Sequence, residues 1–252
     1  MLPIAPAAAP WLHRPAPLVY EPAPGLPTVV YEDPVLLVVD KPSGLLSVPG
    51  RKPEHHDSAL MRLQQAYGPL WVVHRLDMDT SGLIAYARTR EAAAHLGRQF
   101  ERRRVQKTYE AWVWGQPPSI TGVIALPLRL DWPHRPRQCV DALAGKPSVT
   151  HYALVKGDTR RSDALPQWVG RDATIGGAKR ISRLRLTPVT GRSHQLRMHL
   201  SAIGLPIVGD RFYGRSTEAE PTIQRLMLHA QVLELRHPTN DRCLQFQASA
   251  AF

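Results

Sequence analysis

The chain has 252 residues, of which 43% are hydrophobic, so it can bury a full core as one large domain or as two closely packed lobes. No apolar run approaches the ~20 residues that a membrane span requires, which argues against a membrane partner. The formal net charge of +11 favours binding to polyanions such as nucleic acid, although a solvated arginine-rich surface would carry the same charge.

The amino-terminal segment over residues 1–27 is rich in alanine and contains eight prolines. Proline at this density blocks both helices and strand ladders, so the segment predicts a flexible or polyproline-like extension. It lacks the charged-then-apolar order of a signal peptide, and we therefore expect a cytoplasmic protein. Residues 28–252 are expected to form the folded domain.

Hydrophobic periodicity and turn residues divide the folded domain into strands and helices in an irregular order. Strands are expected over 28–32, 36–39, 83–87, 109–114, 149–155, 181–187, 232–235 and 244–246. Helices are expected from a cap at 57–58 to near Gly68, over 89–104 and over 192–202. The stretch from Lys156 to Arg180 predicts a long basic surface loop. Few helices separate the strands, so the predicted class is α+β with a mixed, mostly antiparallel sheet.

The most informative stretch runs from Val73 to Gly82, where polar residues crowd immediately before an apolar strand. A core segment would not carry so many polar groups, so the run predicts a pocket wall at a loop-to-strand junction. Its carboxylate Asp77, taken alone, would more often be a turn or capping aspartate. A second carboxylate, Asp79, follows two residues later and is assigned no catalytic role.

This run resembles the HRLDxxTSG signature of the RluA family of pseudouridine synthases. Further stretches match the family in the right order: 41–51, 107–109, 131–133, 190–197, 209–213 and 226–230. The resemblance covers the chain from about Val29 to Phe252. It implies the pseudouridine synthase catalytic fold over residues 28–252, a bent sheet flanked by helices and loops with the catalytic cleft across it. No amino-terminal S4-type RNA-binding module is expected, because the proline-rich start cannot form one.

The family isomerises uridine in RNA: the bond from the ribose to N1 breaks, the base turns, and C5 joins the same sugar carbon. The base must stay captive throughout, so the enzyme needs a closed pocket and a group that acts covalently or as a base. Because the target lies in structured RNA, the nucleotide must be flipped out and the gap filled. The resemblance makes Asp77 the nucleophile and leaves open whether it attacks the sugar or the base ring.

Two residues are implied to support this nucleophile. Arg197 is expected to hold Asp77 ionised in its guanidinium fork; without the motif it would be an arginine on a helix surface. Tyr109 is expected to stack on the flipped uracil; without the motif it would be an ordinary strand tyrosine.

The expected RNA- and base-binding residues are Arg75, Leu228, Lys107 and Arg192. Arg75 resembles the arginine that fills the space left by the base, with a phosphate contact or a surface salt bridge as the alternative. Leu228 is expected on the edge of the base, with a core position as the alternative.

The resemblance implies RNA as the partner, both large-subunit ribosomal RNA and the tRNA anticodon stem-loop, with no DNA, cofactor or metal, and a monomeric protein. The two cysteines and the scattered histidines match no disulfide framework or zinc motif. Two hypotheses of other classes stay open. One is a non-catalytic RNA-folding or ribosome-assembly factor, which an intact set of Asp77, Tyr109 and Arg197 disfavours. The other is a glycosidase that releases the base from nucleosides.

Overall fold

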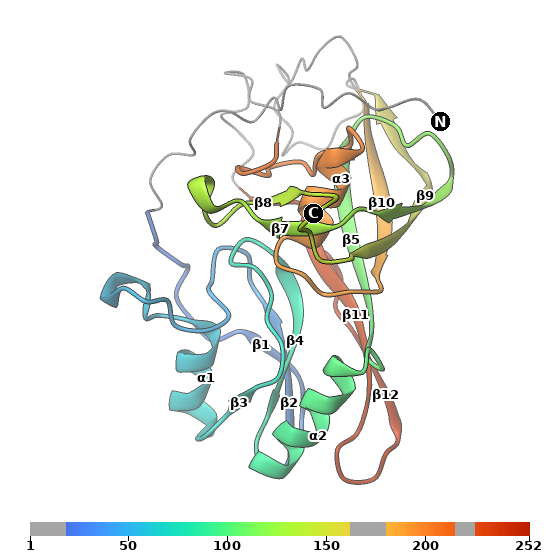
Figure 1. Ribbon diagram of the computed structural model, residues 1–252. Helices are drawn as coiled ribbons and strands as arrows, with labels where there is room; N and C mark the ends of the chain where they lie inside the picture. The colour runs from blue at the N-terminus through green and yellow to red at the C-terminus, as the bar shows by residue number, and fades with distance from the viewer. Residues whose placement is uncertain (1–18, 162–179, 215–224) are drawn as a thin grey trace.

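A computed structural model describes residues 19–161, 180–214 and 225–252 of the chain (Figure 1). Its longer strands are β1 (Thr28–Glu32), β2 (Leu36–Lys41), β4 (Ser81–Ala87), β5 (Gln106–Trp114), β6 (Thr121–Ala125), β9 (Val149–Arg161), β10 (Arg180–Pro188), β11 (Leu228–Arg236) and β12 (Cys243–Gln247). The short strands are β3 (Trp71–Val72), β7 (Leu128–Leu130) and β8 (Gln138–Val140). The helices are α1 (Ala59–Tyr67), α2 (Arg90–Glu101) and α3 (Gln195–Ala202), with 3₁₀ turns η1 (Pro53–His55) and η2 (Trp132–His134).

One mixed sheet runs through the described part of the chain. Its order is β1-β2-β4-β11-β5-β10-β9-β6, with β12 paired to β11 and β3 to β4, while β7 and β8 form a separate hairpin. Each of these pairings is antiparallel except that of β4 with β11, which is parallel. The expected α+β class with a mostly antiparallel sheet is confirmed.

Strand β4 is buried along its whole length because helices cover both faces of the sheet around it. Successive side chains of a strand point to opposite faces. Ile84 packs in one cluster with Leu63 of α1, whereas Ala85 packs in another with Leu96 of α2. Figure 1 shows these two helices flanking the strands. The double cover explains why β4 reads as an unbroken apolar run.

The other half of the sheet has its own core. Leu184 of β10 and Ala111 of β5 share a cluster with Leu196 and Leu200 of α3. Tyr109 of β5 packs against this cluster and also against the cluster around α1. Tyr109 therefore lies where the two halves of the core meet.

Two helices begin at the positions that their capping residues predict. The Ser58 Oγ accepts a hydrogen bond from the N–H of Met61, and the Thr89 Oγ1 accepts one from the N–H of Ala92. These bonds satisfy backbone donors that have no partner within the first turn of a helix.

The predicted bounds of two helices differ from the structure at one end. Helix α2 ends at Glu101, before the expected 104, and α3 begins at Gln195, after the expected 192. Arg103 and His194 have positive φ angles of 56° and 51°. This left-handed conformation cannot continue a right-handed helix, so each residue lies outside it.

The predicted basic loop from Lys156 to Arg180 is wrong at both ends. β9 continues to Arg161 and β10 begins at Arg180, and these two residues pair with each other. Ladder hydrogen bonds join backbone groups, so paired strands can extend beyond their apolar stretch. Residues 162–179 lie outside the described residues. Strands β3, β6, β7 and β8, each of five residues or fewer, are not predicted because they carry too little alternation.

The packed chain begins earlier than residue 28. The Tyr20 hydroxyl donates to the Asp57 carbonyl (2.7 Å) and accepts from the N–H of Leu46 (3.0 Å). Arg62 of α1 donates to two carbonyls of the segment over 23–25. The expected extension is thus too long at its carboxyl end, and residues 1–18 lie outside the described residues.

Replacing Tyr20 by Phe removes both hydrogen bonds while it keeps the ring. We expect a loss of about 1 kcal/mol in the free energy of unfolding, because water can reach the groups left behind. Urea unfolding of Tyr20→Phe beside Val19→Ala, a control at a side chain that is 74% exposed, measures it. Equal stability of both variants and the parent chain would show that this contact does not stabilise the fold.

Candidate active site

A cleft of about 1010 Å³ opens between the loop before β4, strands β5 and β11, and the segment that leads into α3. This volume is at the upper end of the range for small-molecule sites. All seven site residues that the sequence predicts line it: Arg75, Asp77, Lys107, Tyr109, Arg192, Arg197 and Leu228. Residues from distant motifs are therefore gathered around one cavity.

The loop that carries Asp77 is held by the segment that follows β2. The Ser47 Oγ donates to the Leu76 carbonyl (2.7 Å) and accepts from the Leu76 N–H (3.1 Å). The N–H of Gly44 donates to the Met78 carbonyl (3.0 Å). Hydrogen bonds thus fix the backbone on both sides of Asp77.

Lys41 holds the same loop from inside the protein. Its buried Nζ donates to the carbonyls of Pro42, Leu45 and Met78 at 2.8, 2.7 and 3.0 Å. Burial lowers the pKa of Lys41 to about 7, although nearby carboxylates act in the opposite direction. The sequence assigns Lys41 no role, because a lysine at the end of an apolar strand reads as a surface residue.

The guanidinium of Arg197 lies buried at the bottom of the cleft, and its main partner is Asp210. Nε and Nη2 of Arg197 each donate to one oxygen of Asp210 at 2.8 Å. The remaining nitrogen, Nη1, lies 3.5 Å from Oδ2 of Asp77. Arg197 does contact Asp77 as expected, but the expectation that its fork grips Asp77 is wrong, because the fork is on Asp210.

Asp210 is the partner that sequence reasoning missed; its only signal is its place in the matching motif over 209–213. Its Oδ1 also accepts the backbone N–H groups of Phe212 (2.9 Å) and Tyr213 (3.1 Å). Burial opposes the charge on Asp210, but Arg197 and these bonds outweigh it and keep the pKa of the carboxyl below its ordinary value. Burial also opposes the charge on Arg197, yet Asp210 raises the pKa of the guanidinium. Both groups therefore stay ionised.

The wall beside Asp77 is formed by β5 and β11. Tyr109 and Ala230 are direct neighbours across these strands, and Leu228 lies further along β11. Burial raises the pKa of Tyr109, and the charge of Asp77 acts in the same direction, so the hydroxyl stays protonated. Gly82 has a φ of 113°, and a Cβ there would lie 2.4 Å from the Ala230 carbonyl oxygen. Only glycine lets β4 approach β11 this closely.

A histidine that the sequence did not single out also faces the carboxylate. The Nε2 of His194 lies 3.9 Å from Oδ2 of Asp77, and its Nδ1 lies 2.8 Å from the hydroxyl of Tyr213. Burial lowers the pKa of His194, against the attraction of Asp77. The ring is therefore neutral at pH 7 and can accept or donate a hydrogen bond.

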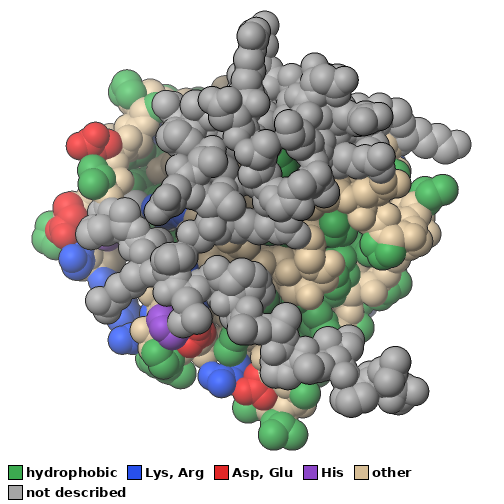
Figure 2. Space-filling model, turned by 90° about the horizontal axis from the view of Figure 1, so that it is seen from above, with side chains coloured by type: hydrophobic (Ala, Val, Ile, Leu, Met, Phe, Trp, Pro, Cys, Tyr) green, Lys and Arg blue, Asp and Glu red, His purple; other side chains and the backbone are tan. Residues whose placement is uncertain are grey.

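The rim of the cleft is cationic. Arg75 and Arg192 are exposed, and Lys107 is partly buried, which lowers its pKa. Three arginines that the sequence did not assign line the same cleft: Arg103, Arg135 and Arg211. In the view from above, the visible basic side chains gather toward one side of the molecule (Figure 2). A cationic rim attracts the phosphates of a nucleic acid.

The second carboxylate of the motif is neutralised at this rim. Oδ2 of Asp79 lies 3.1 Å from Nε of Arg211. The backbone carbonyl of Asp79 accepts a hydrogen bond from the Ser43 hydroxyl (2.6 Å). Asp79 thus ties the loop to its surroundings.

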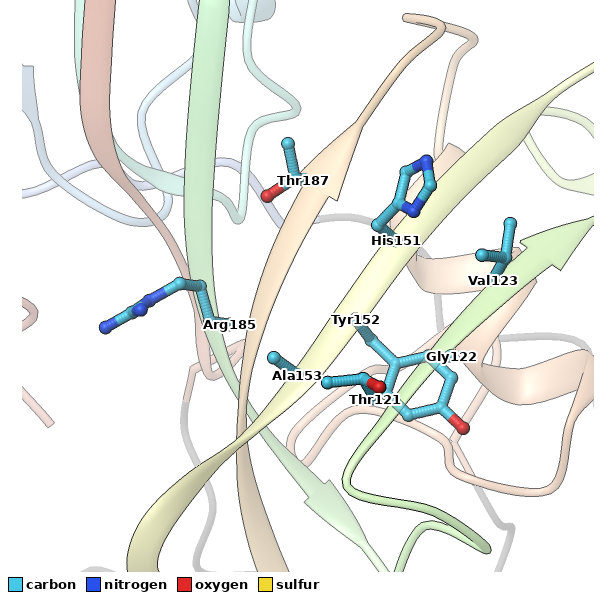
Figure 3. Close-up of a pocket in the computed structure, with 8 residues that line it drawn as sticks. All are labelled: Thr121, Gly122, Val123, His151, Tyr152, Ala153, Arg185 and Thr187. Carbon is cyan, nitrogen blue, oxygen red and sulfur yellow. The ribbon is translucent and has the colours of Figure 1, made fainter.

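A second hollow, of about 330 Å³, lies on the sheet over β6, β9 and β10 (Figure 3). Its side chains form two cross-strand rows, Thr121–Ala153–Arg185 and Val123–His151–Thr187. None of the described residues that line it has a carboxylate, so the larger cleft is the better candidate for a catalytic centre. Among the described residues, no group of three or more His, Cys, Asp or Glu could hold a metal ion. In the same ranges, no helix is long and apolar enough to cross a membrane.

Fold and site together define an enzyme that acts on a polyanion: a carboxylate is positioned at the bottom of a cleft whose rim is cationic. The RNA pseudouridylate synthase family model matches residues 35–202. The chain belongs to this family and is an RNA pseudouridine synthase, an isomerase, of the RluA type.

Relatives and a solved structure agree with this assignment. The chain is 45% identical over 224 residues to the dual-specificity RNA pseudouridine synthase RluA of Escherichia coli K12, covering 89% of this chain and 93% of the relative. It is 48% identical over 210 residues to the RluA of Vibrio vulnificus, covering 83% and 78%. The structure of human RNA pseudouridylate synthase domain containing 1 superposes with a TM-score of 0.71 at 28% identity, covering 91% of this chain and 86% of that one.

Replacing Asp210 by Asn should lower the free energy of unfolding at pH 7 by about 3–5 kcal/mol, because the charge of Arg197 is left buried without its partner. The pKa of Asp210 is lowered in the folded state, so its contribution is complete above the ordinary pKa of an aspartate. It is lost as the pH falls through the lowered value. The difference between the parent and Asp210→Asn should therefore shrink below about pH 4.

Urea unfolding at several pH values tests this, with Asp57→Asn as a matched control. Asp57 also accepts a bidentate pair, from Nε and Nη2 of Arg62 at 2.8 and 2.6 Å, but at the surface. The control should lose less than about 1 kcal/mol. Equal losses in the two variants would contradict a special role for the buried pair.

Proposed function

We propose that this enzyme isomerises uridines in large-subunit ribosomal RNA and in the anticodon stem-loop of tRNA, in the cytoplasm, with Asp77 as the nucleophile. The two-substrate part is supported by relatives at 45–48% identity that are named dual-specificity RNA pseudouridine synthases. The observation that carries the catalytic part is the position of Asp77, 3.5 Å from a buried guanidinium and within one cleft with Tyr109.

The reaction leaves the composition of the RNA unchanged. The bond between N1 and C1′ breaks, the base turns within the cleft, and C5 bonds to C1′; C5 then loses its proton, and N1 gains one. Asp77 acts covalently on the sugar or the base ring, and its ionised form is favoured by the nearby charge of Arg197. The groups that hold its loop, Lys41 and Ser47, keep the carboxylate in place while the base moves.

The uridine must leave its stack to reach Asp77. Tyr109 offers an aromatic face to the flipped base, and Leu228 packs on the edge of that base. Arg75 is exposed at the mouth of the cleft and fills the space from which the base departs. Lys107 and Arg192 bind the phosphates beside it.

Asp77→Asn should abolish isomerisation and leave the dissociation constant for RNA within a few-fold, since the amide is nearly isosteric and lacks only the carboxylate's reactivity. Pseudouridine formed in a uridine-containing stem-loop is measured by mass spectrometry of its nucleosides, with free uracil measured in parallel. Turnover by purified Asp77→Asn would overturn the assignment. Release of uracil by the parent enzyme would indicate a glycosidase instead.

A stem-loop with an unpaired uridine should be converted, whereas the same uridine within a long perfect duplex should not, because unpairing adds to the cost of flipping. Arg75→Ala should reduce turnover of the stem-loop more than it weakens ground-state binding, since its contact forms once the base is out. Single-turnover rates and dissociation constants for both RNAs measure this. Equal rates on hairpin and duplex would exclude flipping as the basis of selection.

A further inference from the structure

The η2 turn between β7 and β8 presents a large aromatic side chain to solvent. Trp132 is 64% exposed, although burial of an indole is strongly favourable. The guanidinium carbon of Arg135 lies 4.8 Å from the centre of its ring. At this distance a guanidinium and an indole attract each other, so the two side chains form one unit.

This unit lies at the mouth of the catalytic cleft. Arg135 and Pro136 belong to the cleft lining, as do Phe212 and His194. Figure 1 shows the β7–β8 hairpin beside α3, above β1 and β4. The lining of the cleft includes both Asp77 and Arg135, so RNA bound along the cleft reaches this unit.

The hairpin is fixed to the wall of the cleft beside its turn. The N–H of Gln138 donates to the hydroxyl of Tyr213 (2.7 Å), which also contacts His194. Within the turn, the N–H of Asp131 donates to the Arg137 carbonyl (2.9 Å). An aromatic surface on a rigid support can bind a ligand at a low cost in conformational entropy.

We propose that Trp132 and Arg135 form a second nucleotide-binding subsite, for an unpaired base of the RNA that flanks the target uridine. The base stacks on the indole, and Arg135 binds the adjacent phosphate. This pairing of an aromatic face with a cation is the chemistry that recognises single-stranded nucleic acid. The inference rests on the proposed function, because it requires RNA in the cleft.

RNA is favoured over a protein partner because Arg135 faces the cleft in which the phosphates bind. Stacking uses the face of the base and not its edges, so the subsite accepts any base that the loop leaves unpaired. It therefore selects loops in which a second base is free at the right distance from the uridine.

The test asks whether the effect of replacing the indole depends on one particular base of the RNA. Dissociation constants are measured in the Asp77→Asn background, so that the RNA is not converted, with and without Trp132→Leu. The RNAs are a uridine-containing stem-loop and a set in which each other loop position in turn is abasic. Trp132→Leu should weaken binding of the intact loop about ten-fold, within the range of base–aromatic stacking. For the RNA that is abasic at one particular position, the dissociation constants with and without Trp132→Leu should have a ratio of about one, because the stacked base is already missing.

Two matched controls separate stacking from changes in the hairpin. Trp132→Phe should retain most of the affinity, because it keeps an aromatic face. Val123→Ala, at a side chain that is 59% exposed on the face of the second hollow, should give a ratio of about one for every RNA. Melting temperatures of all variants should agree with that of the parent.

The phosphate contact is tested by salt. Arg135→Ala should reduce the slope of log affinity against log salt by about 0.7, the value for one phosphate of a single strand. Arg185→Ala, an exposed arginine of the second hollow, should leave the slope unchanged. Trp132→Leu should leave it unchanged as well, since stacking releases no counterion.

A ten-fold loss that persists at every abasic position, or no loss on the intact loop, would overturn the subsite. Turnover of the same stem-loop by the parent enzyme is measured separately. If the parent forms pseudouridine while Trp132→Leu binds every RNA like the parent, the subsite fails and the proposed function stands. If the effect of Trp132→Leu disappears at one abasic position but the parent converts no RNA, the proposed function fails and the subsite stands.

Discussion

The site depends on one buried ion pair, Arg197 with Asp210. A charge removed from water is destabilising unless its partner and its hydrogen bonds replace the lost solvent. Here both oxygens of Asp210 accept from the guanidinium, and two backbone N–H groups complete the set. These hydrogen bonds hold α3 against the segment over 209–214. The remaining guanidinium nitrogen, Nη1, is directed at Asp77. The carboxylate of Asp77 therefore has a positively charged neighbour in a fixed position. Asp77 itself is partly exposed to the cleft, so its own charge is not fully removed from water.

The polar run that surrounds Asp77 serves mainly to hold the backbone. His74 accepts the N–H of Ala85 (2.9 Å), and burial lowers the pKa of His74 to about 3, so the ring is a neutral acceptor. Ser81 is buried against His229 (2.9 Å), and Gly82 lets two strands approach. The run is thus a pocket wall, as its composition predicts: residues 73–80 line the cleft, and several of them also hold the backbone in place. Lys41 also holds this backbone, because its Nζ donates to the carbonyl of Met78, the residue after Asp77.

Sequence patterns predict the features that depend on contacts between residues close together in the chain. Ser58 and Thr89 mark helix starts because a cap bonds to the N–H three residues on. The gathering of the seven site residues follows from the family resemblance, since no periodicity relates Asp77 to Arg197. Asp210 could not be assigned as the partner of Arg197, because an ion pair between a helix and a loop leaves no periodic pattern in the sequence of the helix or of the loop. The same holds for Lys41, whose burial depends on three carbonyls that only the folded chain brings together.

The charges of the site fall into two groups with different physical effects. Those at the bottom, Arg197 and Asp210, are shielded from solvent and act at short range in a medium of low dielectric. Those at the rim, such as Arg192, are exposed; in the proposed function they act through phosphates, which sets affinity and its dependence on salt but reads no sequence. In the proposed function, the wall formed by Tyr109 and Leu228 contacts the face and the edge of a base. Selection among RNAs then rests on how cheaply a loop releases its uridine and where its neighbouring bases lie. If the proposed function holds, such a cleft accepts two RNAs of different sequence, provided that their loops share one shape.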